Sequence, residues 1–316
     1  MTSYVAATAY GGPEVLTVLD ELLPEPSAEQ VRIAVRAAGV NPIDFKSYSG
    51  MFGSDPAALP KRIGLEAAGV VTAVGVDAIG AAGQQISVGD EVIVYGVTGA
   101  YATDLVVPAS TVVPKPPELS WPEAAGLLLT GVTAWHALAA AGVEAGDTVL
   151  IHAAAGGVGL MAVQLAVARG ASVVGTASTR QHELLRSLGA VPVTYGDGLA
   201  ARVRDAAPDG VDAALDLVGT DEAIDVSLEL VTDRTRIVSI AGFVRGLAEG
   251  ITLVGGGPGA DPGTQIRAAA RLQLTELAAN GKLRVVVSQT FPLIEAAEAH
   301  RAVLAGHTTG KVVLVT

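Results

Sequence analysis

The sequence predicts an α/β protein with a doubly wound parallel sheet, preceded by a β-rich segment that forms a second domain. Three observations lead to this prediction. Residues 148–178 have the pattern of a strand, a glycine-rich turn, a helix and a second strand. Strand and helix patterns keep alternating after them, whereas residues 1–121 resemble a small barrel with glycine and proline turns. A chain of 316 residues is long enough for both domains.

The segment at 148–178 is the clearest part of the pattern. Residues 149–151 form the short apolar run that a buried parallel strand needs. A glycine-rich turn occupies 154–159, residues 160–169 carry apolar side chains at helical spacing, and Gly170 ends that helix. A second strand begins at Val173. A βαβ unit with such a first turn is the arrangement that binds dinucleotides.

The glycines of this turn have a physical reason. Amide groups at a helix N-terminus are unpaired and lie at the positive end of the helix dipole, so they attract a pyrophosphate. Gly156 leaves the approach open, and Gly159 lets the helix pack close to the strand. Ala154 stands where the usual pattern has its first glycine. The alternative interpretation is a tight βα turn with only a structural role.

The end of the second strand predicts which cofactor binds. NAD sites usually place an acid about 20 residues after the first glycine, where it binds the ribose hydroxyls. Here residues 175–180 contain no acid, and the first one is Glu183. Ser178 and Arg180 can instead donate to a 2′-phosphate, which predicts NADP(H). The alternative is that Arg180 only begins the next helix as a solvated side chain.

Composition limits the possible partners. Half of the residues are hydrophobic and 16% are charged, as expected for large buried cores, and the net charge of −12 opposes nucleic acid and anionic membranes. Cysteine is absent, so disulfides and thiolate metal sites are excluded. The first residues lack a basic region followed by an apolar run, and no apolar run reaches about 18 residues. We therefore expect a cytoplasmic protein that does not span a membrane.

The other expected elements follow the same two patterns, a β-rich first part and an alternation of strands and helices after it. In the first part, strands are expected at 31–35, 67–76 and 91–94, with a polar island at 40–50. Gly255 to Gly263 is rich in glycine and proline and is expected to be a mobile loop. After Trp121 we expect helices at 121–141 (with Ser120 as N-cap), 183–188, 224–230, 264–280 and 294–304, and strands at 191–195, 211–218, 236–240, 247–254, 283–287 and 311–315.

Five segments occur in an order that points to a family: GVNPIDFKSYSG at 39–50, GLEAAGVVTAVG at 64–75, GDEVIVYG at 89–96, LLTGVTAWHAL at 128–138 and AAAGGVG at 153–159. In these the chain resembles the medium-chain dehydrogenase/reductase superfamily, and within it the zinc-free quinone oxidoreductase branch that includes zeta-crystallin. The similarity covers essentially the whole chain.

The resemblance implies an organisation and a set of binding residues. A GroES-like catalytic domain would occupy 1–121 and be completed by 259–316, and a Rossmann domain at 122–258 would bind NADPH in the interdomain cleft. It also implies a homodimer formed through edge strands near 251–254. The implied cofactor-binding residues are Thr130, Ala155, Gly156, Gly157, Val158, Ser178, Arg180, Tyr195, Leu217, Val218, Gly219, Ile240, Ala241, Gly242 and Lys311.

Departures from the family pattern concern the metal and the acceptor. Zinc-dependent relatives carry a cysteine at the place of Asn41 and a histidine near Leu65, and this chain has neither, so no metal is expected. Quinone reductases often carry tyrosines at the places of Lys46 and Phe52. The form found here looks more like members that reduce enones and alkenals.

The expected reaction is hydride transfer from NADPH to a small electrophilic acceptor, either a quinone or an α,β-unsaturated carbonyl. Negative charge then develops on the carbonyl oxygen and needs hydrogen-bond donors. Asn41, Lys46 and Tyr48 are the candidates, and Asp44 is expected to orient Lys46 or the cofactor amide, because an unperturbed carboxyl is ionised at pH 7. The alternatives are a structural Asn-Pro turn here, or Tyr95 or Tyr101 lining the cleft instead.

The five histidines show no metal-ligand spacing. His136 and His152 lie in apolar contexts and are expected in the core, whereas His182, His300 and His307 are expected on surface helices or loops. Two other function classes stay open: a non-catalytic NADPH-binding or redox-sensing protein, and an enoyl-thioester reductase.

Overall fold

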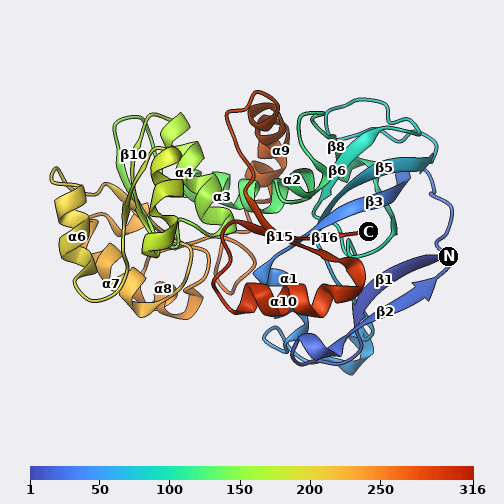
Figure 1. The fold of residues 1–316 in the computed structure, drawn as a ribbon, viewed down its shortest axis with the longest axis horizontal. Helices are drawn as coiled ribbons and strands as arrows, with labels where there is room; N and C mark the ends of the chain where they lie inside the picture. The colour runs from blue at the N-terminus through green and yellow to red at the C-terminus, as the bar shows by residue number, and fades with distance from the viewer. The chain divides into compact units, whose positions relative to one another are not determined.

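The computed structural model describes all residues from 1 to 316, and the chain folds into two compact units. Unit 1 comprises residues 1–129, 272–280 and 285–316, and unit 2 comprises residues 130–271 and 281–284. The division between these units falls at 129/130, inside the helix α3 (Leu128–Ala140), and the domain boundary expected at 121/122 stays a prediction. Figure 1 follows the chain through both units, from blue at the N-terminus to red at the C-terminus.

Unit 1 is built on two sheets. The larger one has the order β15-β16-β3-β5-β6-β8, with β7 paired to β3, and the smaller one has the order β2-β1-β4. β16 runs antiparallel to β3, so the last strand of the chain completes a sheet begun near its start. The strands are β1 (Thr2–Ala7), β2 (Leu16–Glu21), β3 (Gln30–Val40), β4 (Lys61–Arg62), β5 (Glu66–Val74), β6 (Glu91–Tyr95), β7 (Asp104–Pro108), β8 (Val112–Pro114), β15 (Val287–Pro292) and β16 (Lys311–Val315).

Three helices of unit 1 position polar side chains. α1 (Pro42–Tyr48) follows β3 directly, because Pro42 at its first position favours a helix start. α2 (Trp121–Ala125) begins at a capping box of Ser120 and Glu123, as expected for the N-cap. α10 (Ala296–Leu304) packs against β16 (Figure 1). The helix expected at 121–141 is therefore two helices, α2 and α3, and the break falls at Gly126.

Unit 2 contains a fully parallel sheet in the order β11-β10-β9-β12-β13-β14. Numbered along the chain this order is 3-2-1-4-5-6, the doubly wound arrangement whose direction reverses between β9 and β12. The strands are β9 (Thr148–Ile151), β10 (Ser172–Thr176), β11 (Ala190–Val193), β12 (Ala213–Asp216), β13 (Ile237–Ser239) and β14 (Thr252–Leu253).

Helices link these strands. They are α4 (Gly157–Ala168), α5 (His182–Ser187), α6 (Leu199–Ala206), α7 (Asp221–Leu230) and α8 (Phe243–Glu249), followed by α9 (Thr264–Ala279). Of these, α4, α5, α7 and α9 were expected from the sequence, with α7 beginning three residues earlier than expected, whereas α6 and α8 were not. The strand expected at 247–254 is wrong in its first half, because α8 extends to Glu249 and leaves only β14 extended. The strand expected at 283–287 is displaced, since β15 begins at Val287.

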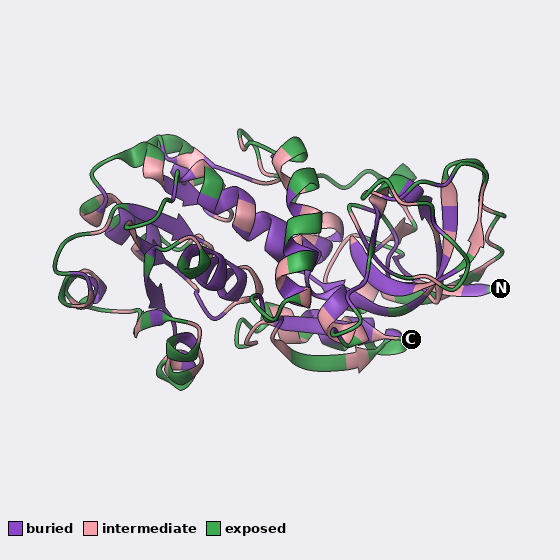
Figure 2. Cartoon of the chain, turned by 90° about the horizontal axis from the view of Figure 1, so that it is seen from above, coloured by how far each residue is buried: buried purple, intermediate pink, exposed green.

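The strands of both units form their cores. Figure 2 shows buried residues concentrated in the strands and on the inward faces of the helices, with the outer faces exposed. The helix α4 is more deeply buried than this, because Gly159 to Ala166 are buried on all sides of it. No helix is long and apolar enough to cross a membrane.

Candidate active site

The glycine-rich turn of unit 2 is held by the neighbouring strand. Ala153 has a left-handed backbone (φ 54°), and its amide donates to the Thr176 hydroxyl at 3.1 Å. A Cβ added at Gly159 would lie 2.3 Å from the carbonyl oxygen of Ala153, so only glycine fits there. At Gly156 the nearest atom would be 3.4 Å away, which an alanine tolerates. The turn is thus held by the hydrogen bond to Thr176, and at Gly156 no side chain blocks the approach of a ligand.

The N-terminus of α4 suits an anion. Gly156 is its N-cap residue, and no side chain caps the helix there. The first amide groups therefore lack the side-chain acceptor that caps most helices, and the dipole of a 12-residue helix adds to their positive potential. The side chains around them are absent or small, at Ala155, Gly156 and Gly157. These residues fit the pyrophosphate of a dinucleotide.

A buried carboxylate organises the next two strand ends. Asp216, the last residue of β12, accepts hydrogen bonds from the amides of Val218 (3.1 Å) and Gly219 (2.7 Å). Its other oxygen accepts from the Ser239 hydroxyl at 2.6 Å. The Ser239 oxygen in turn accepts from the amide of Gly242 at 2.9 Å. One aspartate therefore fixes both loops, 217–219 and 240–242, that the family resemblance assigns to the cofactor.

Neither Asp216 nor Ser239 was predicted from the sequence as a site residue. The available signal was a single acid inside the apolar run AALDLV at 213–218. Such an acid has to be satisfied by hydrogen bonds, since a buried charge is costly without them. Here three donors satisfy the Asp216 carboxylate: the amides of Val218 and Gly219 and the hydroxyl of Ser239.

Most of the predicted cofactor residues lie at one edge of this sheet. The turn 155–158, Ser178, Tyr195, and the two loops all follow the carboxyl ends of their strands, where open α/β sheets bind ligands. Ser178 is half-buried, whereas Arg180 and Tyr195 are exposed. Thr130 is buried in α3. Their roles in binding the cofactor stay predictions.

The loop 255–263 is closed at its base by a backbone hydrogen bond and held at its end by a side-chain contact. The Gly255 amide donates to the carbonyl of Asp261 at 2.8 Å, which closes the loop at its base. The Asp261 carboxylate contacts His136 Nε2 at 3.1 Å, and a Cβ at Gly263 would lie 2.2 Å from the His136 ring. The buried His136, expected in the core, thus anchors the end of the loop on α3.

A buried ion pair lies at the centre of unit 1. Lys311 Nζ is 2.9 Å from Glu66 Oε1, and both side chains are almost completely buried. The same nitrogen donates to Asn41 Oδ1 at 2.6 Å and to the carbonyl of Val40 at 3.2 Å. These three acceptors use all three N–H groups of the Lys311 ammonium, so its expected contact with the cofactor stays a prediction.

Asn41 belongs to the same cluster. Its amide nitrogen donates to Glu66 Oε1 at 3.0 Å and to the carbonyl of Gly39, while its oxygen accepts from Lys311. Only 2% of the residue is exposed. The expectation that Asn41 donates to a carbonyl oxygen of the acceptor is therefore not met, since both donor hydrogens are used inside the unit. The sequence signal for Glu66 was an acid inside the apolar run LEAAGVV.

Asp44 has an unusual environment. Its Oδ2 accepts from the amide of Asn41 at 2.8 Å and from the Tyr101 hydroxyl at 2.9 Å, and its Oδ1 is buried with no partner. Burial raises the pKa of Asp44 to about 7, although the Asn41 amide, Tyr101 and Lys311 oppose the increase. The expectation of an ordinary carboxyl is wrong, because burial perturbs it, and in this structure Asp44 bonds Asn41 and Tyr101 rather than Lys46. Its expected contact with the cofactor amide stays a prediction.

Tyr48 points to another buried residue. Its hydroxyl lies 2.7 Å from His300 Nδ1, and His300 Nε2 lies 3.2 Å from the Tyr101 hydroxyl. All three are buried. Tyr48 therefore does not face an acceptor, and the expected surface position of His300 is wrong, because the apolar face of α10 turns inward. Of the four predicted catalytic residues, Lys46 alone makes no side-chain hydrogen bond and is half-exposed.

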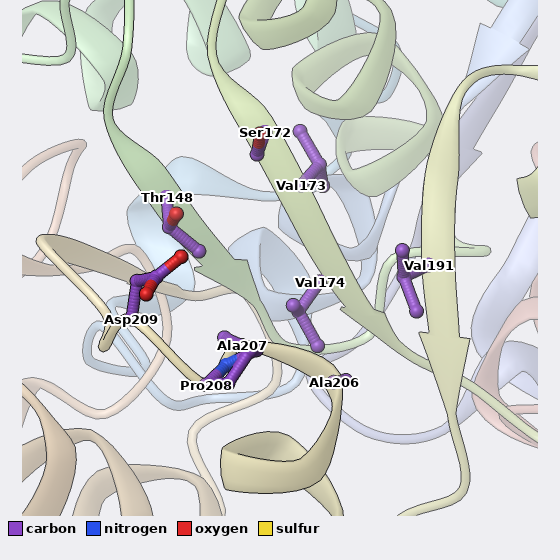
Figure 3. Close-up of a pocket in the computed structure, with 9 residues that line it drawn as sticks. All are labelled: Thr148, Ser172, Val173, Val174, Val191, Ala206, Ala207, Pro208 and Asp209. Atoms are coloured by element: carbon purple, nitrogen blue, oxygen red, sulfur yellow. The ribbon is translucent and has the colours of Figure 1, made fainter.

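Away from the glycine turn, the chain has a hollow but no metal cluster. No group of three histidine, cysteine or acidic side chains could hold a metal ion. A hollow of about 210 Å³ lies at the amino ends of β9 and β10, beside Thr148 and Ser172 (Figure 3). It is on the opposite edge of the sheet from the glycine turn, and Asp209 is its only charged lining residue. It is therefore no candidate for the dinucleotide.

Comparisons with known proteins agree with this geometry. The family model for the alcohol dehydrogenase GroES-like domain matches residues 27–117, and the model for zinc-binding dehydrogenases matches residues 188–314. The chain is 35% identical to a quinone oxidoreductase of Pseudomonas aeruginosa over the full length of both proteins. The quinone oxidoreductase of Escherichia coli complexed with NADPH superimposes with a TM-score of 0.86 at 28% identity, over 99% of this chain and 100% of that one.

A third relative is named for a different activity. The CurK enoyl reductase superimposes with a TM-score of 0.85 at 29% identity, over 99% of each chain. One explanation accounts for three findings: the parallel sheet with its glycine turn, the GroES-like unit, and the 35% identity to a quinone oxidoreductase over its full length. The chain belongs to the medium-chain dehydrogenase/reductase superfamily, in its quinone oxidoreductase branch.

Proposed function

We propose that this protein is an NADPH-dependent oxidoreductase that transfers a hydride to a small electrophilic acceptor, a quinone or the β-carbon of an α,β-unsaturated carbonyl. The observation that carries the proposal is the uncapped turn at Gly156, at the point where the order of the parallel sheet reverses. Similarity to quinone oxidoreductases, one of them solved with NADPH, supports the cofactor.

Each part of unit 2 has a role in this proposal. The amides at the start of α4 bind the pyrophosphate, and the loops fixed by Asp216 and Ser239 position the nicotinamide half. Ser178 and Arg180 bind the 2′-phosphate, which selects NADPH over NADH. NADPH supplies the hydride when bound, and the protein orients it and excludes water.

On the acceptor side, Lys46 is the proposed donor to the carbonyl oxygen. Asn41 and Tyr48 are engaged elsewhere, so the half-exposed ammonium of Lys46 remains as the positive group of the α1 segment. Phe52 is 53% exposed and offers an apolar surface where tyrosine would offer a hydroxyl. We take this difference as support for enones and alkenals over quinones. The reaction needs no metal in this proposal.

The test is NADPH oxidation by the purified protein in the presence of a chelator. Benzoquinones and short 2-alkenals are offered in parallel, with NADH as the control cofactor. Turnover with NADPH and little with NADH supports the proposal, and the better acceptor decides between quinone and enone. Tight NADPH binding without oxidation by any acceptor would favour the non-catalytic binding or redox-sensing alternative.

The similarity to CurK favours one second candidate, an enoyl-thioester reductase. An enoyl thioester of N-acetylcysteamine, added to the same assay, distinguishes this activity. Faster turnover of the thioester than of the matching alkenal would assign the protein to that class. A homodimer through the edge strand β14 and a cytoplasmic location remain part of the proposal, and sedimentation equilibrium of the purified protein checks the first.

A further inference from the structure

Four buried side chains of unit 1 form an unbroken hydrogen-bonded row. Tyr48 Oη is 2.7 Å from His300 Nδ1, His300 Nε2 is 3.2 Å from Tyr101 Oη, and Tyr101 Oη is 2.9 Å from Asp44 Oδ2. They come from α1, α10 and the segment between β6 and β7. Each group in the row can both give and receive a proton.

The direction of the row follows from its ends. Tyr101 donates to the carboxylate of Asp44, so its oxygen is left to accept from His300 Nε2–H. A neutral imidazole has one N–H, so Nδ1 then accepts from the Tyr48 hydroxyl. Burial lowers the pKa of His300 to about 4, which keeps the ring neutral at physiological pH.

The charge balance around Asp44 favours one extra proton. Two carboxyl groups, Asp44 and Glu66, are buried here against a single buried cation, Lys311. Glu66 takes that cation and also accepts from the Leu129 amide at 2.8 Å, whereas Asp44 keeps one oxygen without any partner. A buried carboxylate without its own counter-ion is costly, so burial makes Asp44 much easier to protonate than an exposed carboxyl.

We propose that Tyr48, His300 and Tyr101 form a proton-transfer chain that loads Asp44 with one proton for use in reduction. A proton arriving at Tyr48 Oη displaces its hydrogen to His300 Nδ1, Nε2–H passes to Tyr101 Oη, and the Tyr101 hydrogen passes to Asp44 Oδ2. One proton enters, one is stored, and all hydrogen bonds reform in the opposite direction. The proposal rests on the proposed function, because each hydride added to a carbonyl acceptor requires one proton.

The outer end of the chain lies beneath the short helix η1 (Pro13–Val15). The amide of Gly11 donates to the carbonyl of Tyr48 at 3.1 Å, and α10 packs against η1. Burial raises the pKa of Tyr48, the charges of Asp44 and of the exposed Glu14 add to the increase, and Arg301 opposes it, so Glu14 and Arg301 both act on this end. Water reaching Glu14 is the proton source in this proposal.

The first test needs no acceptor. Infrared difference spectra across neutral pH report the carbonyl band of a protonated carboxyl, and Asp44→Asn assigns it. At high pH this band is weak. After a rapid drop in pH, we expect it to appear on the order of tenfold more slowly in Tyr48→Phe and His300→Phe than in the unchanged protein. Tyr10→Phe is the matched control, because the Tyr10 hydroxyl bonds the Asp55 carbonyl outside the row. Equal rates, or no band lost in Asp44→Asn, would overturn the proposal.

The second test uses turnover. When Asp44 is protonated before the acceptor is added, the first turnover of Tyr48→Phe should proceed at the rate of the unchanged protein. Later turnovers should be slower, because Asp44 has to be protonated again. The expected signature is a burst of one NADPH oxidised per site, with a solvent isotope effect confined to the slow phase. A residue that only supports the fold would slow the first and later turnovers alike. If no acceptor is reduced at all, the proposed function fails and the infrared test still decides the chain.

Discussion

Replacing Asp44 with asparagine should remove a pH-dependent cost of folding. Asparagine keeps an oxygen acceptor for the Asn41 amide and Tyr101 but cannot ionise. The pKa of Asp44 is raised by burial from 3.8 to about 7, so the folded protein holds a proton that the unfolded chain releases above pH 3.8. The difference of roughly 3 pKa units corresponds to about 4 kcal/mol, because one unit is about 1.4 kcal/mol.

The sign follows from proton linkage. Between pH 4 and pH 7 the native state binds more protons than the unfolded state at this position, so rising pH lowers the stability of the native protein. Relative to the unchanged protein, Asp44→Asn should therefore gain stability through this range and reach a plateau above it. The new amide N–H at the place of the unpartnered Oδ1 lowers the whole curve by a constant of about 1–3 kcal/mol.

The assay is urea unfolding of both proteins at a series of pH values. The quantity compared is the difference in unfolding free energy, in which the contributions of all other titrating groups cancel. Asp209→Asn, at an exposed carboxyl, is the control variant. A difference that does not change with pH would refute the assignment of a buried neutral carboxyl at Asp44, whatever its absolute size.

Four further outcomes are expected. Glu66→Gln leaves the buried Lys311 without its counter-ion and should lower the unfolding free energy by about 3–5 kcal/mol in the same assay, a loss that Asp221→Ala, in a surface pair with Arg245, should not show. Gly156→Ala should leave thermal stability unchanged while weakening NADPH binding measured by fluorescence titration, whereas Gly159→Ala should lower the Tm, because its Cβ meets the Ala153 carbonyl; the opposite pattern would contradict the assigned roles. Arg180→Ala should reduce kcat/KM for NADPH roughly 10- to 100-fold, the effect of about 1.5–3 kcal/mol, with NADH unaffected, and an equal loss for both cofactors would exclude a 2′-phosphate contact. Burial lowers the pKa of His152 to about 4 from 6.5, so stability should fall by about 3 kcal/mol as pH drops through this interval, and acid unfolding of His152→Gln should lack that component.

Local patterns in the sequence determined the architecture of unit 2. The apolar run at 149–151, the glycine turn and the helical spacing after it were sufficient to predict β9, α4 and β10, and the alternation after them predicted the doubly wound sheet. These features depend on residues close in sequence, so short-range rules apply to them. Boundaries were less exact where a helix and a strand share one apolar run, as at α8 and β14.

The polar residues of unit 1 were only partly predictable. The sequence identified the island at 41–48 as chemically distinctive, and the structure does place Asn41, Asp44 and Tyr48 in polar networks. Asn41 and Tyr48 were assigned to an acceptor, because the partners that bond their side chains lie far along the chain. Lys311 is 270 residues from Asn41, and His300 is 252 residues from Tyr48.

The sequence by itself therefore determined the family, the parallel sheet and the open turn at Gly156, because each is written in neighbouring residues. Only the tertiary structure decided which polar groups are free. Pairing of β16 with β3 brings Lys311 to Glu66, and packing of α10 against β16 buries His300 between two tyrosines. Burial then sets the protonation of Asp44, since the cost of a charge depends on the surroundings that distant segments create.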